Sequence, residues 1–494
     1  MDAHGIFDRR RAGILLHISS LPGGPGNGDL GAESFRFVDF LAAAGISVWQ
    51  TLPINPTHED GSPYQCTSVH AGNPLLIGLD WLIARGLLEA DAIPPAEDAK
   101  AIRQWALERA FDSFRRRGTS DALCSAFGDF VSANDWWLAD YALYAALKEV
   151  NGGLPWQAWP KPLRDRKPDA LASASTLYAD IIARVRFEQF VFFEQWQGLH
   201  DYAKKLGVLL FGDMPIFVAS DSAEVWAGRE YFELGEDGEP RVVAGVPPDY
   251  FSATGQRWGN PHYNWESMER SGFSWWLNRL RTQLNLYDLI RIDHFRGFEA
   301  YWEIPAHSET AMNGRWVKAP GEALLSRCTE TFGESLPLVA EDLGIITAEV
   351  EALRRRFRIP GMRILQFAFE GGPCNPYLPH NHAIDSVVYT GTHDNDTTLS
   401  WFEGLSAERQ GYVYDYLGRS GLPMPAALVQ AAMASVARLA IVPMQDVLEL
   451  GRGHRMNTPG TVGENWNWRF DWAQLRDEHA ERLAHQVRMY GRTA

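Results

Sequence analysis

Residues 289–294 read Leu-Ile-Arg-Ile-Asp-His, a short apolar run with one charge inside it and an acid at its end. A run of this length is too brief for a helix and predicts a strand buried on both faces. Side chains alternate along a strand, so Arg291 and Asp293 share a face and the guanidinium can bind the carboxylate. The pair can keep Asp293 ionised, as a nucleophile requires, or it can serve only to tie a buried strand into the fold.

Runs of the same kind recur along the chain and alternate with helix-like segments such as 32–44 and 273–285. Together with 289–293, the strand-like runs are 13–17, 47–52, 208–213, 337–341, 362–367, 386–390 and 441–444. This alternation predicts an α/β fold with a parallel sheet, and the polar residues at the strand ends favour a closed (β/α)8 TIM barrel. A doubly wound open sheet is the alternative. Its dinucleotide-binding form is disfavoured, because no Gly-x-Gly-x-x-Gly motif follows the first run.

The spacing of these runs is uneven, which predicts one catalytic barrel domain over residues 1–494 with two insertions. Residues 53–207 are expected to form a mostly helical subdomain. The second insertion, 214–272, includes a stretch that is dense in glycine, proline and aromatic residues. We expect it to form a lid or loop region over the active site.

Composition excludes several classes of function. The formal charge of −16 disfavours binding to a phosphate backbone, so no nucleic-acid partner is expected. The chain has no apolar run long enough to span a bilayer and no secretory signal, so a cytoplasmic protein without a membrane partner is expected. The four cysteines are far apart, and the histidines at the strand ends lack a matching ligand set. We therefore expect no metal and no cofactor.

A second strand end, residues 337–344, reads Pro-Leu-Val-Ala-Glu-Asp-Leu-Gly and carries two acids. Glu341 directly follows the apolar run and has the longer reach, so we expect it to be the proton donor. Asp342 should point to the other side and cap the next helix. The alternative is that both acids are caps or solvated turn residues.

A third strand end, residues 387–396, reads Val-Val-Tyr-Thr-Gly-Thr-His-Asp-Asn-Asp. Gly391 is expected to permit a turn that leaves His393 and Asp394 exposed beyond it. There His393 could donate to a substrate hydroxyl, and Asp394 could bind a hydroxyl pair that tightens in the transition state. A capped helix start or a metal-binding loop is the alternative.

The three signals reinforce one another, because each acid falls at the same end of a different predicted barrel strand, where the active sites of this fold lie. Two carboxylates that flank a glycosidic bond, one ionised and one protonated, are the machinery of glycoside cleavage. A separation of about 5 to 5.5 Å between them is typical of the retaining, double-displacement route.

With these residues in place, the chain resembles the amylomaltases or 4-α-glucanotransferases of glycoside hydrolase family 77. The matching motifs run in order along most of the sequence. They are GILLHISSLP at 13–22, SPYQ at 62–65, GDMP at 212–215, GVPPDYFS at 245–252, GQ at 255–256, WGNP at 258–261, RIDHFRG at 291–297, AEDLG at 340–344, YTGTHD at 389–394 and NW at 465–466.

The resemblance implies Asp293 as nucleophile, Glu341 as acid and base, and Asp394 as transition-state stabiliser, in agreement with the roles argued from the strand ends. It also implies residues that hold the sugar at the cleavage point, namely Asp213, Arg291, His294 and His393. The residues implied to line the glucan path are Ser62, Tyr64, Gln256, Trp258, Phe367 and Asn465. The loop of Asp249, Tyr250 and Phe251 resembles the flexible lid of the family.

The activity expected from the resemblance is transfer of an α-1,4-glucan segment to the 4-hydroxyl of another glucan or of glucose. The partners are then an α-1,4-glucan donor and an acceptor. An α-amylase-type hydrolase that uses the same carboxylates is the nearest alternative. A glucan-binding protein whose acids are structural is an alternative of another class.

Overall fold

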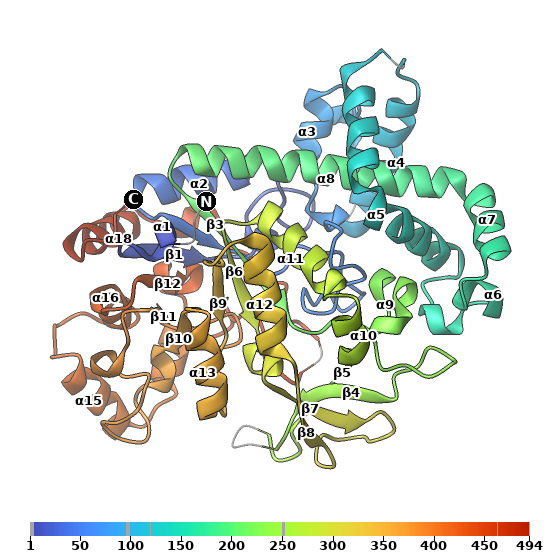
Figure 1. The fold of residues 1–494 in the computed structure, drawn as a ribbon. Coiled ribbons are helices and arrows are strands. Elements are labelled where there is room, and N and C mark those ends of the chain that lie inside the picture. Colours follow the sequence, from blue (N-terminus) through green and yellow to red (C-terminus); the bar gives the residue numbers. More distant parts are fainter. Residues whose placement is uncertain (1–3, 95–98, 119, 249–251, 462, 494) are drawn as a thin grey trace.

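A computed structural model describes the whole chain except residues 1–3, 95–98, 119, 249–251, 462 and 494. Its centre is a closed barrel of parallel strands in the order β1-β12-β11-β10-β9-β6-β3-β2 (Figure 1). The strands are β1 Arg11–Leu15, β2 Val48–Gln50, β3 Leu209–Pro215, β6 Leu289–Asp293, β9 Leu338–Ala340, β10 Gly361–Ile364, β11 Ser386–Tyr389 and β12 Leu439–Pro443. Each corresponds to one of the predicted runs, so the barrel is confirmed.

The open-sheet alternative is excluded by how the barrel closes. Strand β1 pairs with β2 on one side and with β12 on the other, in parallel register. The apolar residues explain the closure, because inward-facing side chains such as Val48, Phe211 and Ile441 are fully buried and form one cluster inside the barrel. Outward-facing side chains pack against the surrounding helices, so both faces of each strand are buried.

The segment between β2 and β3, where we expected a mostly helical insertion, contains helices α3 to α8. The ribbon places α3, α4 and α5 beside the barrel, with the long α8 running from α7 back to β3 (Figure 1). Two glutamines on α8 hold the preceding loop: Gln189 exchanges hydrogen bonds with the backbone of Gly72, and Gln195 with that of Gly78. The helices are α3 Leu79–Ala84, α4 Ala99–Arg115, α5 Ala122–Val150, α6 Lys161–Arg164, α7 Pro168–Leu177 and α8 Ala179–Lys205.

A second sheet, absent from the sequence predictions, forms a lobe beside the barrel (Figure 1). Its antiparallel strands are ordered β5-β4-β7-β8, with bounds β4 Val242–Val246, β5 Gln256–Pro261, β7 Ala300–Pro305 and β8 Arg315–Lys318. We expected a lid or loop region at 214–272, but β4 and β5 pair there, and β7 and β8 extend the sheet beyond that range. Glycine and proline interrupt these strands, several of their residues are partly exposed, and the β4–β7 pairing joins segments about 55 residues apart, so the local pattern resembles a loop.

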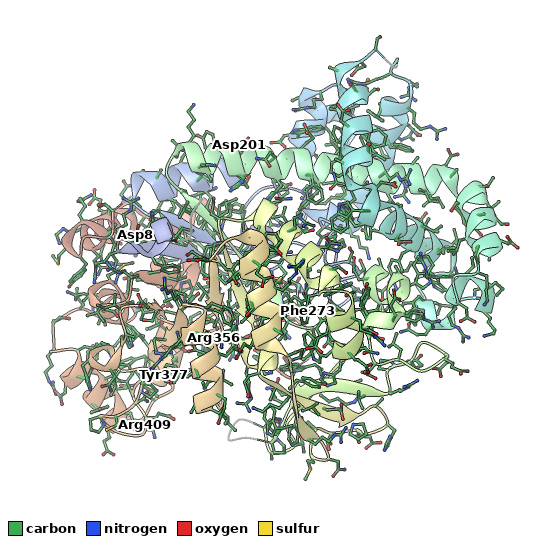
Figure 2. The ribbon with its side chains drawn as sticks, viewed as in Figure 1. Asp8, Asp201, Phe273, Arg356, Tyr377 and Arg409 are labelled. Carbon is green, nitrogen blue, oxygen red and sulfur yellow. The ribbon has the colours of Figure 1, made fainter. Side chains whose placement is uncertain are left out.

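The remaining helices cover the barrel and join its strands. Phe273, expected as the first residue of a helix, instead precedes α11 in a left-handed conformation and is buried (Figure 2). No helix in the described part of the chain is both long and apolar enough to cross a membrane. These helices are α1 His4–Phe7, α2 Ala32–Ala43, α9 Ala223–Ala227, α10 Trp265–Arg270, α11 Ser274–Leu286, α12 Gly321–Phe332, α13 Ala348–Arg356, α14 Thr398–Glu403, α15 Ala407–Tyr416, α16 Ala426–Ala434, α17 Met444–Val447 and α18 Asp477–Met489.

Candidate active site

The predicted site residues meet at the carboxyl ends of neighbouring barrel strands. Asp213 of β3 lies directly opposite Arg291 of β6 in the parallel register. Ile292 of β6 likewise lies opposite Ala340 of β9, and each is followed by an acid. Asp293 and Glu341 are therefore at the same height on adjacent strands, at the end of the barrel where this fold carries its active sites.

Arg291 connects two of the acids. One guanidinium nitrogen lies 2.8 and 2.7 Å from the two carboxylate oxygens of Asp213, and the other lies 2.9 Å from Asp293 Oδ1. Burial works against the charge of Arg291, but the carboxylates of Asp213 and Asp293 raise its pKa well above the ordinary value. Arg291 is thus a fixed positive charge, and the predicted pair with Asp293 is confirmed. The Asp293 side chain keeps 30% of its surface exposed, so a substrate can reach it.

Glu341 is held by the backbone next to Asp293. The N–H of His294 donates to Oε2 at 2.8 Å, and the N–H of Leu343 donates to Oε1 at 2.8 Å. His294 has a φ of 54°, in the left-handed region that side chains other than glycine seldom adopt. Burial and the charge of Asp293 raise the pKa of Glu341 to about 7, although Arg291 and the two N–H groups oppose the shift. Near neutral pH this carboxyl group exists in both protonation states, as an acid-base group requires.

Asp394 is clamped between a ring and an amide. Nε2 of His393 lies 3.2 Å from Oδ2, and Nδ2 of Asn457 donates to Oδ1 at 2.6 Å. Burial alone raises the pKa of Asp394, but His393 and Asn457 outweigh it and lower the pKa to about 2. Asp394 is therefore ionised at neutral pH.

Tyr64 connects the acids from a loop of the first insertion. Its hydroxyl donates to Asp213 Oδ2 at 2.8 Å, and its ring stacks on that of His393, with centroids 5.2 Å apart. The pKa of the phenol is well above its ordinary value because of burial and the negative charges of Asp213, Asp293 and Asp394. One hydroxyl group thus lies within electrostatic reach of three carboxylates from three different strand ends.

The small sheet brings two of the expected glucan-path residues to this site. Trp258 meets the ring of His294 edge to face, with centroids 4.9 Å apart, and donates a hydrogen bond of 3.1 Å to Gln256 Oε1. Burial lowers the pKa of His294 to about 4, so its ring is neutral at pH 7. The buried Nε2 atom of His294 has no hydrogen-bond partner within the described ranges.

The other expected lining residues lie in separate loops. Ser62 is half-buried, and its N–H bonds to Asp60. Phe367 is half-buried against Tyr377, and Asn465 accepts a hydrogen bond from the N–H of Thr458. Asp249 and Tyr250 lie outside the described residues, as does Phe251.

Two expectations about side chains are wrong. Asp342 caps no helix: Oδ1 accepts from the N–H of Met362 at 2.7 Å, and Oδ2 pairs with Arg363 and Arg354. Distant residues on β10 and α13 compete better for this acid than the helix start. His393 is buried rather than exposed, at 8%.

Gly391 has no positive φ, so a turn is not the reason that this position requires glycine. A Cβ at this position would instead lie 2.6 Å from the side-chain amide of Gln366 and 3.3 Å from Asn395. Glycine is required here for space.

Sequence reasoning also missed Asn457 and the ring contacts of Trp466 with Tyr64 and His393. Neither Asn457 nor Trp466 directly follows a strand. The only sequence signal in this loop was the family motif Asn465-Trp466.

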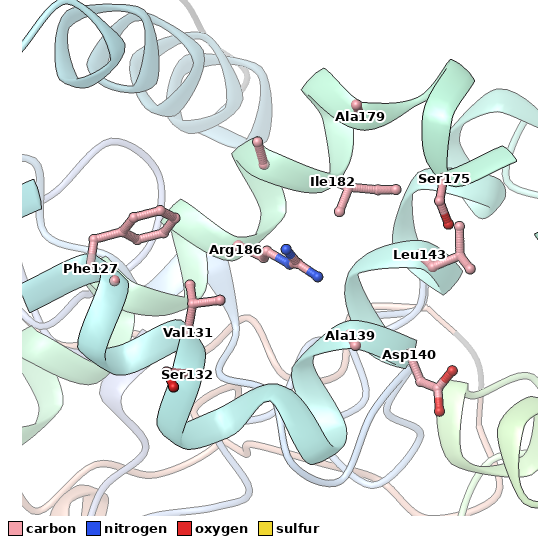
Figure 3. A pocket seen from close by; sticks show the side chains of 12 residues that line it. Phe127, Val131, Ser132, Ala139, Asp140, Leu143, Ser175, Ala179, Ile182 and Arg186 are labelled. Atoms are coloured by element: carbon pink, nitrogen blue, oxygen red, sulfur yellow. The ribbon is translucent and has the colours of Figure 1, made fainter. Parts of the chain in front are cut away.

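The described residues contain no group of three or more His, Cys, Asp or Glu side chains arranged to hold a metal ion. A cavity of about 600 Å³ lies between α5, α7 and α8 (Figure 3). It is mainly apolar, with the guanidinium of Arg186 projecting into it, and none of the predicted site residues lines it. The catalytic candidates therefore belong to the barrel end and not to this cavity.

A (β/α)8 barrel with three acids at the strand ends, one with a raised pKa, defines a class of enzymes that act on glycosidic bonds. Comparison with known proteins identifies the family. The family model described as 4-alpha-glucanotransferase matches residues 16–474. The chain belongs to the 4-alpha-glucanotransferase family.

Individual relatives match over nearly the whole chain. The 4-alpha-glucanotransferase of Thermus thermophilus is 52% identical over 96% of this chain and 97% of its own. That of Synechocystis is 47% identical over 99% of both chains. Among solved structures, the amylomaltase from Streptococcus agalactiae in complex with acarbose superposes with a TM-score of 0.94 at 36% identity, covering 98% of this chain and 100% of that one.

Proposed function

We propose that this protein transfers a segment of an α-1,4-glucan to the 4-hydroxyl of another glucan or of glucose, by a retaining double displacement through a glycosyl-Asp293 intermediate. The observation that carries the proposal is the backbone link between the two reacting acids. Glu341 accepts the N–H of the residue next to Asp293, so the two carboxyl groups hold a defined relation to one bond. Family membership supports the choice of reaction.

In the first step Asp293 attacks the anomeric carbon. The buried guanidinium of Arg291, whose pKa is raised well above its ordinary value, lies 2.9 Å from the Asp293 carboxylate. Glu341 gives its proton to the oxygen of the departing glucan, and the bond from that oxygen to the anomeric carbon breaks. A pKa of about 7 leaves a substantial protonated fraction at neutral pH.

In the second step the now ionised Glu341 takes the proton of the incoming 4-hydroxyl, whose oxygen displaces Asp293. Two inversions at one carbon preserve the α configuration. Asp394 binds a pair of sugar hydroxyls more tightly as the ring flattens in the transition state. Asp213, Arg291, His294 and His393 are proposed to hold the same sugar, where the buried Nε2 of His294 has an unfilled hydrogen-bond position, and Tyr64 is proposed to line the glucan path.

The glucan path is proposed to continue along Gln256 and Trp258 on the small sheet, with Ser62, Phe367 and Asn465 at its margins. Indole and phenyl faces suit the apolar faces of glucose rings. Asp249 and Tyr250 keep their proposed place in the lid. A single catalytic unit with two insertions and a cytoplasmic location remain predictions from the sequence.

The test is the product profile from maltotriose. Transfer predicts chains longer and shorter than the substrate together with free glucose, at a constant number of reducing ends. A steady rise in reducing ends would instead mark a hydrolase. Asp293→Asn should lower turnover by several orders of magnitude. If the protein only bound glucan and its acids were structural, the same substitution would leave its function unchanged.

A further inference from the structure

The loop that follows β12 and α17 holds Asp394 in place. Asn457 donates from its side chain to Asp394 Oδ1 at 2.6 Å and from its backbone to the carbonyl of His393 at 3.1 Å. Arg455 donates to the carbonyl of Asp394 at 2.6 Å and to that of Asn457 at 2.7 Å. Arg455 and Asn457 thus hold the consecutive residues His393 and Asp394 by hydrogen bonds to backbone and side chain.

Asp394 needs such support because it lies beyond the end of β11 and not in the sheet. Its side chain is 44% exposed, so the barrel alone does not select one orientation of the carboxylate. His393 approaches one oxygen and is itself fixed by stacking on Tyr64. The amide of Asn457 fixes the other oxygen, and Asn457 is only 9% exposed. A carboxylate gripped at both oxygens has one orientation.

We propose that Asn457 is a positioning residue for the transfer reaction: its amide orients the Asp394 carboxylate toward the sugar hydroxyls. The inference rests on the proposed role of Asp394. An amide suits this task because it donates a hydrogen bond at every working pH and adds no charge beside a carboxylate that must stay ionised. A purely structural role is the alternative, since Asn457 also begins the loop in which Thr458 bonds to Asn465.

A double-mutant cycle separates the two roles. We would measure kcat and KM for Asn457→Ala, Asp394→Ala and the double variant, using α-maltotriosyl fluoride as donor so that weak activities remain measurable. A charge-assisted hydrogen bond predicts a loss of about 10- to 100-fold in kcat for Asn457→Ala, with KM nearly unchanged. In the Asp394→Ala background the same change should cost nothing further, because the group it positions is absent.

The matched control is Asn151→Ala at the end of α5, which removes an asparagine Nδ2 bond of 2.7 Å to the backbone carbonyl of Leu147, a residue outside the site. Its kcat should equal that of the parent. If Asn457→Ala leaves kcat unchanged, or costs the same factor in both backgrounds, Asn457 has no positioning role. If Asp394→Ala itself keeps full activity, the proposed function fails instead.

A second variant guards against loss of folding. Asn457→Asp preserves the shape but replaces the donor with a carboxylate facing Asp394. It should lose more activity than Asn457→Ala at neutral pH, and part of that loss should disappear at lower pH, where the pair of acids shares a proton. A pH profile parallel to that of the parent would overturn the proposal.

Discussion

At the scale of single residues, the site depends on which groups can bind two acids at once. Arg291 binds both oxygens of Asp213 with one nitrogen and Asp293 with the other. Lysine carries the same charge but a single nitrogen, which cannot span both carboxylates. Arg291→Lys should therefore lower kcat by about 100-fold or more while the far-ultraviolet circular dichroism stays unchanged. A kcat within a few-fold of the parent would show that charge alone suffices.

The protonation of Glu341 sets a second residue-scale prediction. Its pKa is raised to about 7, and only the protonated form can release a glucan, so kcat/KM for a maltooligosaccharide donor should fall as the pH rises through about 7. Fluoride leaves without a proton. Glu341→Ala should therefore lose several orders of magnitude with maltotriose but keep much of the first step with α-maltotriosyl fluoride. Equal losses on both donors would argue against an acid role.

At the scale of elements, close packing of β3 against the residue that follows α11 keeps Asp213 in register. Gly212 of β3 lies against the ring of Tyr287, and a Cβ there would overlap that ring. Gly212→Ala should destabilise the protein by about 1–3 kcal/mol and also reduce activity, because the next residue binds Arg291. Gly198→Ala on α8 is the control, since a Cβ there meets nothing within 4 Å, and it should stabilise by about 0.5–1 kcal/mol. Denaturant unfolding of both variants decides the matter, and equal stabilities would refute the packing argument.

At the scale of the whole molecule, the barrel must be closed between its first and last strands. Arg492 lies at this seam. Its guanidinium donates to the carbonyls of Met433, Ser435 and Ala437 on the approach to β12, and to that of Arg11 at the start of β1, at 2.7 to 2.9 Å. A residue near the end of the chain thus satisfies buried carbonyls on both sides of the closure.

Arg492→Ala should cost on the order of 2–4 kcal/mol, because several buried carbonyls lose their donor together. Large proteins often unfold irreversibly, so the half-life of activity at a fixed elevated temperature is the suitable measurement. Arg488→Ala changes an exposed arginine of the neighbouring α18 and should have little effect. Comparable half-lives for the two variants would mean that the seam does not depend on Arg492. Turnover at moderate temperature should be the same in both.

The barrel, and the strand ends at which its acids lie, could be predicted from the sequence because both follow from the local pattern of apolar and acidic residues. A short apolar run that ends in Asp293 or at Glu341 specifies a doubly buried strand and the end at which its acid lies. The small sheet is different. Its strands differ in exposure, from the buried β4 to the exposed β8, and β4 pairs with β7 only after a long intervening segment, so no local period marks them.

What the sequence by itself determined is the fold class, the family and the three acids at the strand ends. Only the tertiary structure decided how those acids behave, since the pKa of a carboxyl group depends on burial and on neighbours from other strands. Thus burial and Asp293 raise the pKa of Glu341 against Arg291 and two backbone N–H groups, whereas His393 and Asn457 lower the pKa of Asp394 against burial. Such contacts join residues that are far apart along the chain, and only folding brings their atoms within hydrogen-bonding distance.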